Sequence, residues 1–426
     1  MAPHVLTTPL SIGGTTTVRN RLYRAPVLEG AGSGPDAGRR YAKAFVPNAE
    51  AGVGLVVQGS SCLYAEGRTS PGMTLVHERE RVLALAGMVA AVHAAGAAIW
   101  LQVGHGGIYA MEAWHEPYAS GRKGPLLAAS PLPKLLRPAF AGVPVHVMST
   151  AEVEALCVRY GDVAAWAREA GYDGIQLGSA NAKLLDQFLS PFYNHRGDEF
   201  GGSLAGRARV LRRIREEVGA RAGWDYTVTV KLPAETAPPA MARTTVDETV
   251  QLARLVEDFG YDAVTPVEVS VFPDTTLSRG GIPTSLWRNK AMKTRFAQAA
   301  PSQLRRGVLS AGYVLGGVTH PFRPVWNRDL FKSVKAAVGV PVLAVGGIRT
   351  RDEADSILDG GEADLVGVGR PFYAEPDLAA AFLAGGGGPA LRCQNSNLCV
   401  PAQMLGMKGV CYNPAVRSRS SQEGDG

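Results

Sequence analysis

Several features that mark other classes of protein are scarce in this 426-residue chain. Cysteine occurs only five times, which is too few for a disulfide scaffold. No run of about 18 uncharged apolar residues occurs, so we expect no membrane-spanning helix. The segment from Met1 to Ser11 lacks a basic stretch followed by an apolar one, so we expect no secretory signal. These absences predict a cytoplasmic protein that does not act at a membrane.

Charged residues are also sparse, at 19%, whereas hydrophobic residues reach 46%, which predicts a sizeable folded core. The net charge of +6 is concentrated in residues 271–325, which are +7 and leave −1 for the remainder. This segment has one acid, Asp274, and these basic residues: Arg279, Arg288, Lys290, Lys293, Arg295, Arg305, Arg306 and Arg323. A local excess of this kind argues against nucleic-acid binding and favours a small, anionic partner.

Short apolar segments rich in Val, Ile and Leu alternate with longer amphipathic ones. The expected strands are 21–26, 53–58, 98–103, 173–178, 226–232, 262–266, 341–345 and 363–368. The expected helices are 39–51, 78–95, 151–171, 203–219, 245–260, 327–338, 350–360 and 375–384. Strands without polar alternation are typical of parallel sheets covered on both faces. The pattern predicts an α/β fold, namely a (β/α)8 TIM barrel. A doubly wound sheet is the alternative, but no Gly-x-Gly-x-x-Gly follows the first strand.

Three segments interrupt this alternation. Residues 104–148 are proline-rich and loop-like, and residues 271–325 form a basic, partly helical insertion after strand six. Residues 391–426 follow the last helix, hold three cysteines and end in a polar tail from Arg417 onward. We therefore expect a barrel over residues 1–390 and a C-terminal extension over 391–426.

Glycines follow the last two expected strands, at Gly346-Gly347 and at Gly369, which precedes Arg370. Glycine lets backbone N–H groups approach an anion, and arginine adds a forked cationic donor. These two loops are the usual phosphate site of a TIM barrel. Gly59, Gln102 and Lys231 end other strands and are expected to face the same cavity. Such groups suit a flat, phosphate-tailed, hydrogen-bonding cofactor, and flavin mononucleotide (FMN) is one.

Motifs along the chain resemble the old yellow enzyme family of flavin oxidoreductases. The similarity covers residues 1–415 apart from the insertion. The matching stretches are 20–26 (NRLYRAP), 52–57 (GVGLVV), 102–107 (QVGHGG), 170–174 (AGYDG), 185–191 (LDQFLSP) and 194–203 (NHRGDEFGGS), together with the two glycine loops. The resemblance implies FMN as cofactor, NADPH or NADH as electron donor, and hydride transfer to an activated C=C bond of a small molecule. It carries the FMN contacts to Ala25, Pro26, Val27, Gly59, Gln102, Lys231, Gly347, Gly369 and Arg370.

The chain departs from the family after strand four. The family has a His-x-x-His or His-x-x-Asn pair that binds the substrate carbonyl, followed by a tyrosine that donates a proton. Here the corresponding residues are Gly178, Asn181 and Lys183. The carbonyl-polarising pair is therefore half missing, and Lys183 needs a lowered pKa to act as a proton donor. His105, after strand three, either contacts the ligand or braces its loop.

The C-terminal extension contains Cys393, Ser396, Cys399 and Cys411 in the order in which some relatives have four cysteines around an iron–sulfur cluster. Such clusters need thiolate ligands, and serine occupies the second position. The sequence therefore predicts no metal.

Two alternative functions stay open at this point. The flavin could instead remove hydride from a substrate and return electrons to oxygen, giving desaturation or aromatisation. The chain could also be a flavin-binding scaffold without turnover. The insertion is expected either to cover the mouth of the active site, with Trp287 and Phe296 as apolar contacts, or to serve as a rim or a subunit contact in a homo-oligomer.

Overall fold

The computed structural model of this protein describes residues 4–272, 278–384 and 391–416, apart from the side chain of Glu112. Asp274 and the polar tail from Arg417 lie outside this part of the chain. Within it, eight parallel strands follow one another around a barrel. They are β3 (Leu22–Arg24), β4 (Leu55–Cys62), β6 (Ala98–Gly104), β9 (Gly174–Leu177), β10 (Thr227–Thr236), β11 (Ala263–Ser270), β12 (Leu343–Val345) and β13 (Leu365–Val368).

The strand order is β11-β10-β9-β6-β4-β3-β13-β12, so each strand pairs with its neighbours along the chain. A bridge between Val264 and Val342 joins the two ends of this order, and the Val264 N–H donates to Pro341 O at 3.0 Å. The barrel fold expected from the alternation is confirmed. All eight strands therefore end on the same side of the molecule.

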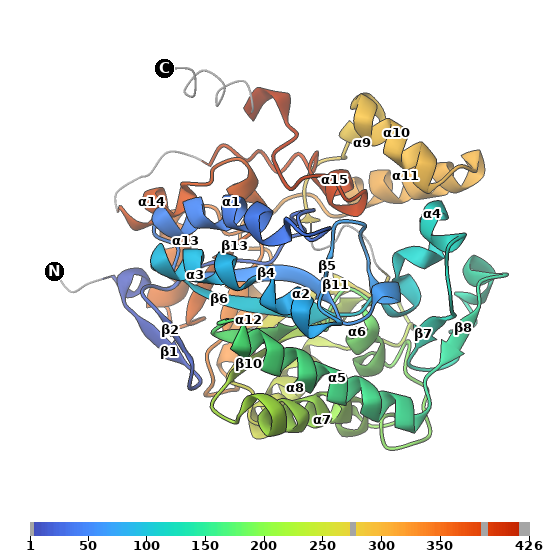
Figure 1. Cartoon of the computed structure of the whole chain (residues 1–426), viewed down its shortest axis with the longest axis horizontal. Helices are drawn as coiled ribbons and strands as arrows, with labels where there is room; N and C mark the ends of the chain where they lie inside the picture. The colour runs from blue at the N-terminus through green and yellow to red at the C-terminus, as the bar shows by residue number, and fades with distance from the viewer. Residues whose placement is uncertain (1–3, 273–277, 385–390, 417–426) are drawn as a thin grey trace.

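The outer ring of helices also follows the predicted pattern (Figure 1). It comprises α1 (Ala37–Glu50), α2 (Arg79–Leu83), α3 (Ala86–Ala94), α5 (Thr150–Glu169), α7 (Leu204–Ala222), α8 (Val246–Asp258), α12 (Arg328–Lys335), α13 (Arg351–Asp359) and α14 (Leu378–Leu383). The helix expected over 78–95 is divided into α2 and α3. Helix α5 starts at a capping box in which Ser149 and Glu152 satisfy each other's backbone N–H groups.

A short hairpin that the sequence pattern did not predict closes the N-terminal end of the barrel. It consists of β1 (Leu10–Ile12) and β2 (Thr16–Val18). Ile12 and Val18 pack against the apolar side chains inside the barrel, among them Trp100. The Trp100 indole N–H donates to Thr16 Oγ1 at 2.9 Å, which satisfies its polar atom in the core.

The three interrupting segments have different structures. The stretch after β6 contains α4 (Glu116–Ala119) and a small parallel pair, β7 (Leu126–Ala128) with β8 (Val145–Val147). The insertion folds into α9 (Ser285–Arg288), α10 (Lys290–Ala299) and α11 (Gln303–Thr319), which project together from one side of the barrel in Figure 1. The C-terminal extension contains α15 (Val400–Met404). Among the described helices, none has the length and apolar character needed to cross a bilayer.

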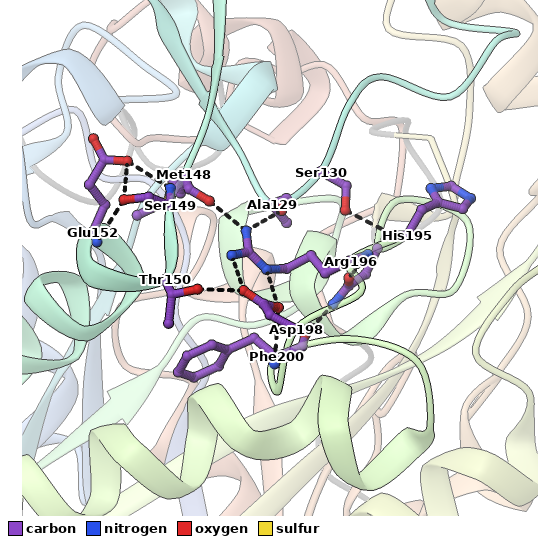
Figure 2. A network of polar contacts seen from close by, with 11 residues as sticks. Ala129, Ser130, Met148, Ser149, Thr150, Glu152, His195, Arg196, Asp198 and Phe200 are labelled. Atoms are coloured by element: carbon purple, nitrogen blue, oxygen red, sulfur yellow. Dashed lines mark hydrogen bonds and ion pairs between the residues drawn. The ribbon is translucent and has the colours of Figure 1, made fainter.

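One buried arginine ties the loop after β9 to the neighbouring β7–β8 region (Figure 2). Arg196 pairs with Asp198 through two hydrogen bonds, of 2.8 and 2.5 Å, and donates to Ala129 O and Met148 O. Asp198 also accepts from Thr150 Oγ1 at 2.7 Å. These contacts hold the pKa of the Asp198 carboxyl well below its usual range, chiefly through the hydrogen bonds from Arg196. The motif residues Arg196 and Asp198 therefore anchor the loop.

Replacing Arg196 with alanine should leave the Asp198 carboxylate and two backbone carbonyls without their donor. We expect Arg196→Ala to destabilise the protein by about 3 kcal/mol, because breaking a buried ion pair leaves a charge uncompensated. Thermal unfolding monitored by circular dichroism measures the effect. Arg212→Ala is the control, since Arg212 makes an exposed 3.6 Å pair with Glu216 and should cost less than about 1 kcal/mol. Equal losses in the two variants would contradict the anchoring role.

Candidate active site

A cavity of about 320 Å³ opens at the C-terminal ends of the barrel strands. It is lined by residues from all eight strand ends or the loops after them, and by α15 of the extension. Twelve of the thirteen residues singled out from the sequence line it: Ala25, Pro26, Val27, Gln102, His105, Asn181, Lys183, Lys231, Gly346, Gly347, Gly369 and Arg370. The fold thus brings together side chains that lie up to 345 positions apart in the sequence.

The thirteenth residue, Gly59, does not line the cavity. A Cβ atom at this position would lie 2.4 Å from Pro26 Cβ and 2.7 Å from Gln102 Oε1. Glycine is therefore needed here, because any larger side chain would collide with Pro26 and Gln102. The next residue, Ser60, takes its place on the cavity wall.

The glycine loops after β12 and β13 form one end of the cavity. Gly346 and Gly347 have φ angles of 121° and 81°, a region that favours glycine. Arg370 lies beside them and is oriented by Asn397, which accepts from Nη1, and by Arg279 O, which accepts from Nη2 at 3.0 Å. Arg349, which sequence analysis did not single out, brings a second guanidinium to the cavity.

Gln102 and Lys231 lie on the barrel wall, on β6 and β10. Gln102 Nε2 donates to Gln176 Oε1 at 2.8 Å, and Gln176 donates in turn to Thr265 Oγ1 at 3.2 Å. This chain fixes the Gln102 amide with its oxygen as the free acceptor. Lys231 has no ion pair or hydrogen bond from its ammonium group within the described residues, and burial lowers its pKa to about 8.

The loop after β9 makes an unusual turn in which Asn181 and Ala182 both have left-handed φ angles, of 62° and 55°. Asparagine tolerates this region, whereas alanine does so at a cost. Two side chains of α6 (Leu184–Leu189) hold the turn. Asp186 Oδ2 accepts from Ala182 N at 2.6 Å, and Gln187 Nε2 donates to Ala182 O at 2.8 Å. The turn directs Asn181 and Lys183 to the cavity, and the buried Asn181 Oδ1 has no hydrogen-bond partner in the described part of the chain.

Lys183 has the chemistry that the sequence analysis required of it. Burial lowers the pKa of its ammonium group to about 8, although the nearby Asp186 acts in the opposite direction. No carboxylate lies within ion-pair distance of Lys183 in the described part of the chain. Burial and the neighbouring Glu235 raise the pKa of Asp186 itself, which weakens it as a counter-ion. A lysine with a pKa near neutrality can donate a proton as the ammonium and accept one as the neutral amine at working pH.

His105 is held in place by its own loop. Its Nδ1 accepts from the Gly107 N–H at 2.9 Å, and its ring meets Tyr64 edge-on with centroids 5.7 Å apart. Burial lowers the pKa of the imidazole to about 4, so it is neutral at pH 7. Its role as a loop brace is therefore supported by contacts, while its place on the cavity wall leaves room for a ligand contact.

Tyrosine could also donate a proton, but Tyr23, Tyr64, Tyr109 and Tyr193 do not line the cavity. Tyr109 and Tyr193 hydrogen-bond to each other at 3.0 Å in a separate apolar cluster. Burial raises the pKa of Tyr109 to about 12. Lys183 therefore stands alone among the proposed donors in facing the cavity with an accessible pKa.

The insertion and the extension contribute differently from what the sequence suggested. From 271–325, only Ser278 and Phe322 reach the cavity among the described residues. Phe296 is buried inside the insertion, whereas Trp287 is exposed and bonded to Ser310. The extension instead supplies a wall of Asn395, Val400, Gln403 and Met404, which the sequence analysis missed because no motif marks them.

The three cysteines of the extension lie around a small hollow of about 20 Å³ next to the main cavity. Ser396 lies on the same hollow, as its spacing suggested. Burial raises the pKa of the Cys399 thiol to about 11, which disfavours the thiolate that iron binding requires. That the protein holds no metal stays a prediction.

Comparison with known proteins gives this site a context. The chain is 26% identical to an NADH oxidase of Thermoanaerobacter brockii, over 92% of the chain and 53% of that protein. It is 27% identical to an N,N-dimethylglycine/sarcosine dehydrogenase of Chromohalobacter salexigens, over 98% and 54%. It is also 27% identical to a 4,4'-dithiodibutanoate disulfide reductase of Rhodococcus erythropolis, over 95% and 94%. The chain thus spans about half the length of the first two relatives and nearly all of the third.

Two solved structures share the fold. A 2-naphthoyl-CoA reductase complex superposes with a TM-score of 0.75 at 19% identity, covering 97% of this chain and 57% of that one. Morphinone reductase in complex with tetrahydroNAD superposes with a TM-score of 0.62 at 21% identity, covering 90% and 92%.

The model of the NADH:flavin oxidoreductase / NADH oxidase family matches residues 5–297 and 318–384, which include both glycine loops and the turn after β9. The match spans the whole barrel and leaves out most of α11. FMN is the cofactor of this family, and NADH or NADPH is its electron donor. By this match and by the fold that positions the cavity, the chain belongs to the NADH:flavin oxidoreductase / NADH oxidase family.

Proposed function

We propose that this chain reduces an electron-poor C=C bond of a small organic substrate, using FMN and NADPH or NADH, with Lys183 as the proton donor. The observation that carries the proposal is the buried ammonium of Lys183 at the position of the missing tyrosine, facing the cavity beside Asn181. A tyrosine and a lysine with a lowered pKa can supply the same proton.

The cavity is chemically suited to FMN. Four cationic side chains line it, namely Lys183, Lys231, Arg349 and Arg370, and among the described residues no carboxylate side chain does. Such an excess of positive charge is costly to bury without a bound anion. We propose that Arg370, with the backbone of Gly346, Gly347 and Gly369, holds the phosphate, and that Ala25, Pro26 and Val27 face the ring.

We propose that Gln102 and Lys231 bind the pyrimidine edge of the ring. The Gln102 oxygen is free to accept a hydrogen bond, since its amide N–H donates to Gln176. Lys231 would place a positive charge where the reduced ring becomes anionic, which favours reduction. Bound FMN would supply the hydride chemistry, which none of the twenty side chains provides.

The remaining groups would act on the substrate. Asn181 lines the cavity and would donate its side-chain N–H to the substrate carbonyl oxygen. Its Oδ1 has no partner among the described residues and would be free to accept a hydrogen bond from the ligand. One carbon of the double bond would receive the hydride, and Lys183 Nζ would give its proton to the other. The resulting neutral amine would be reprotonated from solvent. The elements of H2 are thus added to the substrate.

A second candidate reaction runs in the opposite direction. Above pH 8 the neutral amine of Lys183 could accept a proton from a substrate that loses hydride, with oxygen as the final acceptor. Only Asn181 remains of the two side chains that would bind a substrate carbonyl. This favours the second candidate, since a substrate without a carbonyl group needs no such pair. A similar dehydrogenase of dimethylglycine and sarcosine is among the relatives.

The pH dependence separates the two directions. If Lys183 donates the proton, the rate at which substrate re-oxidises the reduced enzyme should fall as the pH rises through about 8, because the ammonium form is lost. If Lys183 accepts the proton, the rate of enzyme reduction by the substrate should rise through the same pH. Anaerobic stopped-flow with cyclohexenone or with dimethylglycine measures these rates through the flavin absorbance.

Lys183→Met should remove this titration and slow the step with substrate by about 10²- to 10⁴-fold, while FMN stays bound and reduction by NADPH or NADH is unchanged. Lys231→Arg is the matched control, because Lys231 also has a pKa of about 8 and arginine keeps the charge without titrating there. The change in rate through about pH 8 should persist in Lys231→Arg. Its loss in that variant alone would assign the titration to Lys231.

Variants at the two ends of the cavity should separate cofactor binding from turnover. Arg370→Ala should weaken FMN binding by about 10- to 100-fold, since a charge-assisted contact contributes roughly 1.5–3 kcal/mol. Asn181→Ala should keep FMN and lower turnover. Fluorescence titration of the apoprotein with FMN measures the affinity, and equal flavin loss in both variants would contradict these roles.

A further inference from the structure

The solvent-facing side of α11, in the insertion, carries no charged residue. Its exposed residues from Leu304 to Thr319 are Leu304, Gly307, Val308, Ala311, Gly312, Val314, Leu315, Val318 and Thr319. Leu304 is 81% exposed, and Val308, Leu315 and Val318 are 62–65% exposed. A helix that faces water normally shows charged and polar residues on that side. We call this set the α11 face.

The α11 face concentrates the exposed apolar surface of the protein. Five of the ten large hydrophobic residues that are exposed in the described chain belong to it: Leu304, Val308, Val314, Leu315 and Val318. Most of the others are single residues on separate elements, such as Leu135 and Trp224. A contiguous apolar patch of this kind marks an interaction site, whereas single exposed residues do not.

The spacing along the α11 face is that of a helix-pairing seam. Leu304, Val308, Ala311, Leu315 and Val318 follow one another at intervals of four, three, four and three residues. This is the heptad spacing that keeps one stripe of a helix facing a partner helix. The opposite side of α11 is already occupied, because Leu309 and Tyr313 pack on the cluster that contains Phe296 and Leu405.

Two glycines of the α11 face point to the same conclusion. Glycine inside a helix costs about 0.5–1 kcal/mol relative to alanine. A Cβ atom at Gly307 or Gly312 would meet nothing within 4 Å, so no contact within the chain requires glycine there. Small residues beside an apolar stripe let the backbone of a second helix approach closely.

We propose that α11 forms a symmetric, antiparallel helix pair with α11 of a second copy of this chain. The stripe is self-complementary about Ala311. In an antiparallel pair Leu304 meets Val318 of the partner, Val308 meets the partner's Leu315, and Ala311 meets its own counterpart. The layers on either side of Ala311 thus each join a leucine with a valine, and the stripe is self-complementary, as an isologous two-fold interface requires.

The charges of α11 favour this arrangement. Its two charged residues, Arg305 and Arg306, lie in its first turn. Both already donate to backbone carbonyls of their own chain, Arg305 to Ala113 O at 2.6 Å and Arg306 to Ala300 O at 2.8 Å, and an antiparallel pair keeps the arginines of the two copies at opposite ends of the seam. A parallel pair would instead bring the four arginines together. A membrane surface fits less well, because helices that lie in the lipid interface carry basic residues along their length.

Pairing of this kind would also brace the cavity. The insertion packs on Ala402 and Leu405, at and just beyond α15, and the same helix supplies Val400, Gln403 and Met404 to the cavity wall. The second copy would restrain a wall of the proposed active site without contributing a residue to it.

The mass of the FMN-loaded full-length protein in solution tests the proposal. Sedimentation equilibrium should give twice 44.9 kDa for the wild type and a single mass for Leu315→Glu, since a buried charge on both sides of the seam opposes pairing. Leu135→Glu is the matched control: Leu135 is 60% exposed but lies outside the α11 face, so the dimer should persist. Unchanged flavin absorbance and far-UV circular dichroism exclude misfolding, which is not expected because the replaced side chain is largely exposed.

A monomeric wild type, or a Leu315→Glu variant that stays dimeric, would overturn the proposal. Binding of a monomeric wild type to phosphatidylglycerol vesicles would assign the α11 face to a membrane instead.

Crosslinking tests the orientation. In the antiparallel pair, the two copies of residue 304 lie about 21 Å apart along the axis, whereas residue 304 lies beside residue 318 of the partner. A mixture of Leu304→Cys and Val318→Cys proteins should therefore crosslink with a short bismaleimide, and each variant alone should not. Wild-type protein controls for the native cysteines. Efficient crosslinking of each variant with itself would show a parallel pair and contradict the proposed symmetry.

Discussion

The closure of eight parallel strands is the constraint on which the rest of this structure depends. The bridge between Val264 and Val342 joins the first and last strands of the sheet order, so that no strand remains at an edge. Because the strands are parallel, their C-terminal ends form one rim, and loops from distant parts of the sequence meet there. Gln102, Lys183, Lys231 and Arg370 share one cavity for this reason.

Burial of positive charge gives this cavity its chemistry. Lys183 and Lys231 both lose hydration without gaining a carboxylate partner, and the pKa of each falls to about 8. Acids that lie nearby are engaged elsewhere: Glu29 pairs with Arg24, and Glu268 pairs with Arg279. A bound anion would therefore stabilise the folded protein as well as equip it for redox chemistry. The same argument supports Lys183 as the proposed proton donor.

The two segments outside the barrel have different positions: the C-terminal extension forms a wall of the cavity, and the insertion lies at the protein surface. The extension reaches back over the strand ends, where Gln403 O accepts from Ser70 and Asn397 orients Arg370. The insertion packs on the far side of that extension and leaves the α11 face open. The basic residues Arg288, Lys290 and Lys293 are exposed on α9 and α10 and do not reach the cavity. These charges thus lie on the protein surface. The cavity is covered by α15, whereas the sequence had suggested the insertion as a possible cover.

The sequence by itself indicated a parallel sheet covered by helices, because eight apolar segments without polar alternation are typical of strands buried on both faces. The lack of Gly-x-Gly-x-x-Gly after the first strand favoured a barrel over a doubly wound sheet. The sequence also determined which residues follow each strand, and twelve of the thirteen that we singled out on this basis line the cavity. It could not determine the hairpin β1–β2, whose short strands carry too little periodicity. Nor could it show that Asp186 and Gln187 hold Asn181 and Ala182 in left-handed conformations, or that burial lowers the pKa of Lys183 with no described carboxylate at ion-pair distance. Burial and side-chain direction depend on contacts between segments far apart in the chain, and only the tertiary structure decides them.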